Sequence, residues 1–268
     1  GQLDLFVGNY VKWTPPTDVY CSTDGAKAYC APTSFEGVPS LLYRNLGDGR
    51  FQEVGERIGI GSLVGKSFGV AVADYNADGW PDLAVANDTK DNFLFLNRAG
   101  LEFEEMGLEA GIALSPAGSA RAGMGIDAAD WRNDGTFGLV IGNFSRECLA
   151  LYANLGDARF REMSYAAKLG PPSLLLLTFG VFFFDYNLDG FQDVFAANGH
   201  IDDFIRRKDA RVTYEQPALL CRGGTERTFV DVTKSSGPAL REKRVLRGAA
   251  HGDFDNDGDP DLAVVWNN

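Results

Sequence analysis

Short apolar runs alternate along the chain with clusters of glycine, asparagine and aspartate. Some runs mix apolar and polar positions, as in "SFGVAVAD" at 67–74, and others are nearly continuous, as in "DLAVAND" at 82–88. Runs of this length between turn residues are typical of β-strands, and they lack the 3.6-residue period of an amphipathic helix. The pattern therefore predicts an all-β protein built from many short strands.

The same three kinds of segment recur in a fixed order. An apolar run with an internal glycine leads into an acidic loop, and a second apolar run follows that loop. A third segment carries an asparagine turn and an aligned phenylalanine. The acidic loop and its following run stand at 74–88, 185–199 and 253–267, with a decayed copy at 130–144; the third segment stands at 41–54, 93–106, 150–163 and, more weakly, 218–232.

Each repeat reads as four strands, A to D, and repeats of four strands indicate a β-propeller. Residues 1–268 are predicted to form one propeller region with three complete blades and two partial ones. The first blade lacks strand A and the last has only strands A and B, so the natural protein is predicted to be longer. The predicted blades are about 1–54, 67–106, 123–163, 178–232 and 247–268.

The acidic loops have the donor set of a calcium site. A hard cation takes six to eight oxygen ligands, and glycine at loop position 6 allows the sharp turn. Side chains at positions 1, 3, 5 and 9 and the carbonyl at position 7 are the predicted ligands. The three sets are Asp74, Asn76, Asp78, Trp80 and Asp82; Asp185, Asn187, Asp189, Phe191 and Asp193; and Asp253, Asp255, Asp257, Asp259 and Asp261.

Three other interpretations of the loops are weaker. An EF-hand needs a bidentate glutamate at position 12, where this chain has Val85, Ala196 or Val264. A plain polar turn does not explain three near-complete copies. A catalytic pair of carboxylates would not recur at the same place in every repeat, so no residue is predicted to be catalytic.

The loop at Asp130–Gly138 is predicted to bind no metal. Arg132 replaces the ligand at position 3 and Gly138 replaces the one at position 9. We expect the guanidinium of Arg132 to neutralise Asp130 and Asp134 in place of an ion. About three Ca²⁺ sites remain.

Charge and composition narrow the class of protein. The formal net charge of −12 argues against nucleic-acid binding. The longest apolar run, 174–184, is too short to span a bilayer, so no transmembrane segment is predicted. Cys21 and Cys30 are nine residues apart in a polar segment, which favours a local disulfide over two free thiols and, with it, an oxidising compartment. Cys148 and Cys221 have apolar neighbours and are predicted to be buried thiols.

The motifs "LYRNLGDGRFQEV", "GWPDLAVAND" and "RGAAHGDFDNDGDPDLAVV" resemble the FG-GAP/VCBS repeats of integrin α-subunit propellers. The resemblance is closer still to ASPIC/UnbV-type proteins, which are related to cartilage acidic protein and also carry paired cysteines. It covers nearly the whole chain. It implies a calcium-stabilised propeller, usually seven-bladed, in an extracellular, cell-surface or periplasmic location.

These features favour a binding or scaffold module over an enzyme. Its protein partner is expected on the long segments 10–40 and 199–216, between strands B and C. Aromatic residues of the first segment, Trp13, Tyr20, Tyr29 and Phe35, either contact that partner or cover a small core of their own.

Three alternatives remain open. One is a glycan-binding propeller with pockets lined by Asn9, Asn87, Asn143 and Asn198. Another is a subunit of a surface filament or larger complex. A hydrolase or lyase on the propeller face is less favoured, because the chain has only two histidines; His251 is expected to pack, and a catalytic or metal role for His200 has little support.

Overall fold

The computed structural model describes residues 2–23 and 25–267. Residue 1, where the first predicted blade begins, and residue 268, where the last one ends, therefore lie outside the described residues. Nearly all of the regular structure is antiparallel β-strand. None of the helices in the described part is long and apolar enough to cross a membrane. These helices are single turns: η1 (Pro15–Thr17), η2 (Pro32–Ser34), α1 (Gly107–Ala110), α2 (Gly170–Ser173), α3 (Ile205–Lys208) and η3 (Ala239–Arg241).

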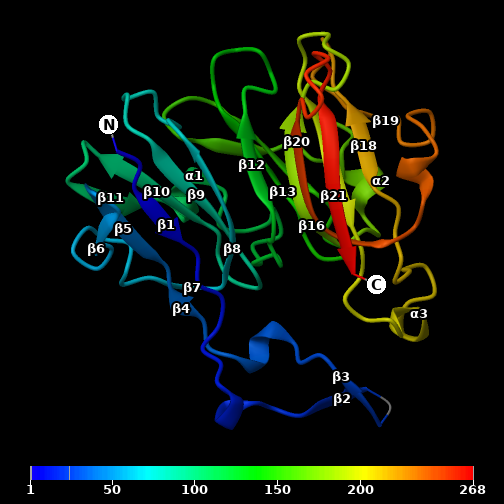
Figure 1. The fold of residues 1–268 in the computed structure, drawn as a ribbon, viewed down its shortest axis with the longest axis horizontal. Helices are drawn as coiled ribbons and strands as arrows, with labels where there is room; N and C mark the ends of the chain where they lie inside the picture. The colour runs from blue at the N-terminus through cyan, green and yellow to red at the C-terminus, as the bar shows by residue number, and fades with distance from the viewer. Residues whose placement is uncertain (1, 24, 268) are drawn as a thin grey trace.

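Five antiparallel sheets follow one another along the chain (Figure 1). We number them in chain order. The first sheet contains β1 (Leu5–Val7), β5 (Leu41–Gly47) and β6 (Arg50–Glu53), and the second contains β8 (Ser67–Ala73), β9 (Asp82–Asn87), β10 (Phe93–Arg98) and β11 (Glu102–Glu105).

The third and fourth sheets repeat the plan of the second, and the fifth has two strands. The third contains β12 (Ile126–Ala129), β13 (Gly138–Ile141), β14 (Ala150–Asn154) and β15 (Phe160–Glu162); the fourth contains β16 (Thr178–Phe184), β17 (Asp193–Asn198), β18 (Leu219–Arg222) and β19 (Val230–Asp231); and the fifth contains β20 (Val245–Gly252) and β21 (Asp261–Asn267). Two small ladders complete the list, β2 (Cys21–Thr23) with β3 (Ala26–Ala28) and β4 (Val38–Pro39) with β7 (Val64–Gly65).

In each four-stranded sheet, neighbours in sequence are neighbours in space, in the order A, B, C, D that the repeats predict. The second strands β9 and β17 are buried along their whole length. Burial on both faces explains why these strands read as continuous apolar runs rather than as alternating ones.

From the second sheet to the fifth, the first strands of consecutive sheets lie side by side, and glycine makes this approach possible. A Cβ atom added to Gly69 would lie 2.6 Å from the carbonyl oxygen of Met124 in the next repeat. At Gly125 it would lie 2.3 Å from the carbonyl of Phe179, and at Gly180 it would lie 3.0 Å from that of Arg247. Each repeat's glycine therefore admits the backbone of the next repeat, which is the packing expected of inner propeller strands.

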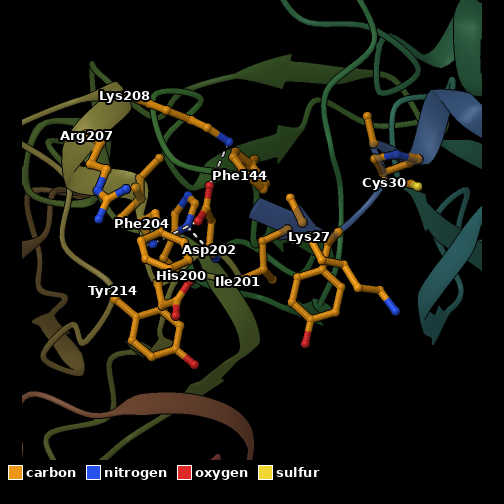
Figure 2. Close-up of a pocket in the computed structure, with 16 residues that line it drawn as sticks. Lys27, Cys30, Phe144, His200, Ile201, Asp202, Phe204, Arg207, Lys208 and Tyr214 are labelled. Carbon is orange, nitrogen blue, oxygen red and sulfur yellow. Dashed lines mark hydrogen bonds and ion pairs between the residues drawn. The ribbon is translucent and has the colours of Figure 1, made fainter. Parts of the chain in front are cut away.

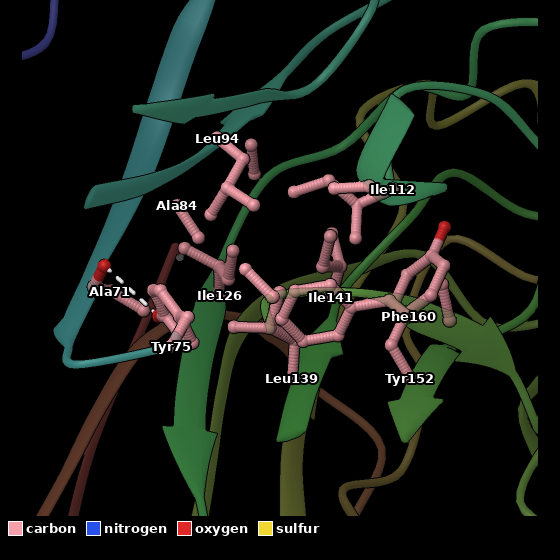
Figure 3. Packing of buried hydrophobic residues seen from close by; sticks show 14 of the residues in the cluster. Ala71, Tyr75, Ala84, Leu94, Ile112, Ile126, Leu139, Ile141, Tyr152 and Phe160 are labelled. Carbon is pink, nitrogen blue, oxygen red and sulfur yellow. Dashed lines mark hydrogen bonds between the residues drawn. The ribbon is translucent and has the colours of Figure 1, made fainter. Parts of the chain in front are cut away.

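The hydrophobic core lies between consecutive sheets. Between the second and third sheets, Ala84 and Leu94 pack with Ile126 and Ile141 (Figure 3). Equivalent clusters join the first sheet to the second, the third to the fourth and the fourth to the fifth. The fold is therefore all-β and propeller-like, because every sheet obtains its core from its neighbours.

Candidate functional site

Four acidic loops share one hydrogen-bond pattern. Each joins the first strand of a sheet to the second. Both carboxylate oxygens of Asp74 accept backbone hydrogen bonds, from Asp78 at 3.1 Å and from Gly79 at 2.8 Å. The same pair of bonds forms at Asp130 with Asp134 and Gly135, at Asp185 with Asp189 and Gly190, and at Asp253 with Asp257 and Gly258.

The loops also share their unusual backbone angles. Position 6 is glycine in all four, with φ between 83° and 95°. Glycine reaches this left-handed region at no steric cost. Position 4 has φ between 51° and 61° in every loop. The turn is therefore the same in the decayed copy as in the three loops with a full set of predicted ligands.

In the loop at 253–261, carboxylate oxygens of Asp253, Asp255 and Asp261 all lie within 4.8 Å of one another. Asp253 and Asp255 are exposed to solvent. Gathered carboxylate oxygens repel one another and suit a hard divalent cation. This loop therefore fits Ca²⁺ by its donor chemistry.

In the other two predicted calcium loops, asparagine at position 3 is tied to the aspartate at position 5. Asn76 donates to Asp78 at 2.9 Å, and Asn187 donates to Asp189 at 2.9 Å. The carboxylates of Asp78 and Asp189 also accept the N–H groups of Trp80 and Phe191, whose carbonyls are the predicted position-7 ligands.

The aspartates at position 9 of these two loops are fully buried and anchor the loop to the third strand. Asp82 accepts backbone hydrogen bonds from Tyr75 at 2.9 Å and Asn97 at 2.8 Å. Asp193 accepts them from Tyr186 at 3.0 Å and Gly223 at 2.8 Å. Burial raises the pKa of Asp82, and it raises that of Asp193 to about 6. A cation beside either carboxylate would offset this burial.

Our prediction for Arg132 is half right. Its guanidinium lies 2.8 Å from Asp134 and donates to the carbonyl of Asn154 at 2.5 Å. Within the described residues it forms no ion pair with Asp130, whose two carboxylate oxygens accept the backbone N–H groups of Asp134 and Gly135. Burial alone would raise the pKa of Asp134. The hydrogen bond from the Thr136 hydroxyl and the positive charge of Arg132 together outweigh burial and lower this pKa.

Gly138 is required at position 9 of the same loop by packing. A Cβ atom here would lie 2.3 Å from Nε1 of Trp131. That indole donates to the carbonyl of Tyr152 at 3.1 Å and is buried. The indole therefore occupies the space that a position-9 carboxylate would need.

The opposite end of the sheets carries the segment at 10–40. Cys21 and Cys30 form the predicted disulfide, with sulfur atoms 2.05 Å apart. The side chains of Trp13, Tyr20 and Tyr29 are 50%, 71% and 81% exposed. The alternative that the aromatics of this segment cover a small core of their own is therefore wrong for these three, whereas Phe35 is half-buried.

A cavity of about 710 Å³ lies between this segment and the loop at 199–214 (Figure 2). His200 lines it but is itself buried, and its Nδ1 accepts the N–H of Asp202 at 3.0 Å. Burial lowers the pKa of His200 and so favours the neutral ring. No group of three histidine, cysteine or acidic side chains that could hold a metal gathers at His200 in the part of the chain described.

His251 packs, as predicted, with its ring 4.9 Å from that of Phe182 and 5.6 Å from that of Phe184. Cys148 and Cys221 are free and buried, also as predicted. Burial raises the pKa of these thiols to about 11 and about 12. Neither cysteine is poised to react, because the reactive form is the thiolate.

Four recurring asparagines donate to backbone carbonyls, and they line neither of the two cavities at this end of the sheets. Asn87 donates to Asp91 at 2.7 Å, Asn143 to Cys148 at 2.8 Å and Asn198 to Pro217 at 3.0 Å, and all three side chains are buried. Asn9 donates to Pro39 at 2.8 Å. These residues hold the turns between strands through their amide nitrogens, and Oδ1 of Asn143 is buried without a hydrogen-bond partner among the described residues.

The FG-GAP-like repeat model matches residues 1–85 and 74–141, which together cover residues 1–141 of 268, more than half of the chain. The chain belongs to the FG-GAP-like repeat family. The matched region of this FG-GAP-like protein includes the acidic loop at 74–82 and the decayed loop at 130–138.

The FG-GAP-like chain is also similar to cartilage acidic protein 1 of Xenopus tropicalis, with 29% identity over 96 residues. That match covers 36% of this chain and 13% of the relative. Among solved structures, a lectin of Agrocybe aegerita that recognises non-reducing terminal N-acetylglucosamine has a TM-score of 0.38 and 17% identity. The match covers 73% of this chain and 47% of the lectin, and a TM-score this low supports no argument about function.

Proposed function

We propose that this FG-GAP-like chain is part of a calcium-stabilised β-propeller that acts outside the cytoplasm as a protein-interaction module. The observation that carries the proposal is the set of exposed aromatic side chains Trp13, Tyr20 and Tyr29 on a segment that also contains the Cys21–Cys30 disulfide. Exposed aromatic residues are typical of protein interfaces. A disulfide suits an extracellular, cell-surface or periplasmic location.

The metal and the partner are assigned to opposite ends of the sheets. The acidic loops leave the first strands at one end, where Figure 1 shows the loop before β21 at the top. The segment at 10–40 and α3 lie at the other end. In this proposal calcium holds the loops between first and second strands, and the partner binds where second strands lead to third ones.

Three Ca²⁺ sites are proposed, in the loops at 74–82, 185–193 and 253–261, and none at Asp130–Gly138. Melting the protein in calcium and in EDTA tests this assignment. Calcium at 100 times its dissociation constant should add ~2.7 kcal/mol per site, because it binds the folded state. An unchanged melting temperature in EDTA would exclude structural calcium.

Site-specific crosslinking tests the interaction surface. A photoreactive benzoyl-phenylalanine replaces Tyr29 in one variant and Leu101 in the control. Leu101 is 79% exposed, against 81% for Tyr29, and lies in a turn at the acidic-loop end. We expect a discrete protein adduct in native cells from position 29 alone. Adducts of equal yield from both positions would contradict the assigned face.

The closer family type and the extent of the propeller are also proposals. The similarity to cartilage acidic protein 1 supports an ASPIC/UnbV-type protein. Apolar side chains remain exposed on the outer sheets, with Leu5 at 48% and Val265 at 62%. We propose that further blades of a longer, seven-bladed propeller cover them. The proposal assigns no catalytic residue, and a glycan adduct in the crosslinking experiment would instead favour a lectin.

A further inference from the structure

A second cavity, of about 520 Å³, lies where four sheets meet. We call it the central pocket. The residue before the inner-strand glycine of each repeat lines it: Phe68, Met124, Phe179 and Arg247. Loops that follow the second strands close its sides, and they contribute Asp88 and Glu147. Its volume is that of a small-ligand site. Tyr29, Cys30 and Pro32 of the segment at 10–40 also line it, so the pocket borders the surface proposed for the partner, whereas the acidic loops contribute nothing to its lining.

Aromatic rings form one wall of the central pocket. The rings of Tyr10 and Phe68 are 4.6 Å apart, and those of Phe68 and Phe179 are 6.2 Å apart. The guanidinium of Arg247 lies 4.4 Å from the centre of the Phe179 ring. This wall therefore already holds one organic cation by a cation–π contact.

Arg247 is fixed in place by backbone carbonyls. It donates to Gly199 at 2.9 Å, to Leu246 at 2.8 Å and to His200 at 3.2 Å. It forms no ion pair within residues 2–23 and 25–267. Arg247 thus belongs to the wall of the pocket and does not neutralise the carboxylates in it.

The carboxylate of Asp88 is buried and half satisfied. The residue is 7% exposed, and its Oδ2 accepts the hydroxyl of Tyr10 at 2.6 Å. Its Oδ1 is buried and has no hydrogen-bond partner in the described structure. A buried carboxylate oxygen without a hydrogen bond destabilises the fold, and a ligand that donates a hydrogen bond to this atom would remove the penalty.

Glu147 is the second carboxylate of the pocket. Its Oε2 accepts the N–H of Ala122 at 2.8 Å. Lys66 and Arg121 are the nearby cations that influence Asp88 and Glu147. Lys66 donates to the carbonyl of Pro32 at 2.5 Å, and Arg121 lies 3.7 Å from Glu162. Within the described chain neither cation forms an ion pair with a pocket carboxylate.

The nearby cations do not compensate the burial of these two acids. Burial raises the pKa of Asp88 despite Tyr10 and Lys66, and it raises the pKa of Glu147 despite Ala122 and Arg121. The backbone beside both acids is also strained, with φ of 57° at Thr89, 77° at Arg146 and 50° at Cys148. Strain of this kind concentrates at functional sites.

We propose that the central pocket binds an organic cation, an ammonium or guanidinium group on an apolar stem. Oδ1 of Asp88 accepts a hydrogen bond from the cation, and Glu147 adds a second negative charge. Phe68 and Met124 contact the stem. The cation comes from a free amine or from a lysine or arginine side chain of a peptide. The proposal goes beyond the proposed function and does not depend on calcium.

The first test uses the unmodified protein and three matched probes in calorimetric titrations. The probes are 2-phenylethylamine, 2-phenylethanol and 3-phenylpropionate, which share a ring and differ in charge. We expect the amine to bind at least tenfold more tightly than the alcohol, and the acid not to bind. Equal affinity for amine and alcohol would overturn the proposal, because a neutral donor would then suffice.

The source of the cation is tested with an acetylated, amidated Gly-Lys-Gly peptide in competition with the amine. Displacement of 2-phenylethylamine by the peptide indicates a side chain of a partner, and selective retention of the amine indicates a free ligand. Both results support the same recognition chemistry. The titrations are repeated in EDTA, where amine binding should persist even if the calcium assignment fails.

Three variants place the ligand in the pocket. Asp88→Asn should weaken amine binding at least tenfold, and Glu147→Gln should weaken it severalfold. The control is Glu226→Gln, a change at an exposed glutamate outside the pocket, which should have no effect. Should Asp88→Asn fail to fold, Glu147→Gln decides. Unchanged affinity in a folded pocket variant would overturn the assignment.

Discussion

The residue at position 9 of each acidic loop determines how that loop is attached to its sheet. Asp82 and Asp193 are buried and tie their loops to the third strand through backbone N–H groups. In the decayed loop the indole of Trp131 fills that space, so Gly138 is the residue that fits. The ion pair of Arg132 with Asp134 then supplies the electrostatic link inside the loop.

This difference predicts how two aspartates at position 5 respond to calcium. Asp78→Ala should remove most of the stabilisation that calcium gives through this loop, which is ~2.7 kcal/mol at 100 times the dissociation constant. The calcium-dependent rise in melting temperature should become smaller accordingly. Asp134→Ala leaves Arg132 unpaired, so its cost should be the same in calcium and in EDTA. Thermal melts of both variants in both buffers measure this. A calcium-dependent cost for Asp134→Ala would show that the decayed loop binds metal.

At the scale of elements, close contact between inner strands sets the spacing of the sheets. The glycines before β12 and within β8 and β16 each face a backbone carbonyl of the next repeat. Side chains of these strands and of the strands that follow them then meet between the sheets, as Ala71, Ile126 and Ile141 do (Figure 3). The glycine of the repeat is therefore needed for packing between repeats, and its neighbour on the N-terminal side faces the central pocket.

Two glycine substitutions distinguish this packing role from strand propensity. Gly125→Ala should destabilise the protein by ~2–3 kcal/mol, because the new Cβ would meet the carbonyl of Phe179, a backbone atom that cannot move aside alone. Gly248→Ala is the control, since its nearest neighbour is a methyl of Val265 at 3.1 Å. Urea unfolding should show a loss below ~1 kcal/mol there. Equal losses would contradict the contact between repeats.

At the scale of the whole molecule, the segment at 10–40 extends away from the sheets (Figure 1). Its hairpin β2–β3 pairs only with itself among the described strands. Stability here is local, because few buried contacts join the hairpin to the body. The disulfide therefore constrains the hairpin that carries Tyr29 and contributes little to the sheets.

Removing the disulfide should affect the hairpin and spare the body. A disulfide closing so short a loop contributes ~3 kcal/mol in the chain-entropy view. In the Cys21→Ser/Cys30→Ser variant, trypsin should cleave at Lys27 about tenfold faster by this local loosening. The melting temperature of the sheets should stay within about 1 °C of the original. A fall of several degrees would mean that the segment is part of the cooperative core.

The repeated motifs carry the strand order and the loop turn in the sequence itself, because both depend on short-range chemistry. Aspartate at position 1 and glycine at position 6 close the same turn four times, even at Asp130 and Gly135. The paired cysteines are likewise close enough in sequence for their bond to be predicted.

What tertiary structure alone decided depends on contacts between distant residues. The sequence did not show that Arg132 pairs with Asp134 and not with Asp130, or that Trp13 and Tyr29 stay exposed. Asp88 resembles an ordinary turn residue until folding brings Tyr10, 78 positions away, against its carboxylate. The residues before the strand glycines recur at a fixed place in the repeat and can be read from the sequence. That they form the wall of one pocket follows only from the arrangement of four sheets around it. Such contacts have no local pattern, because the chain between them is free to vary.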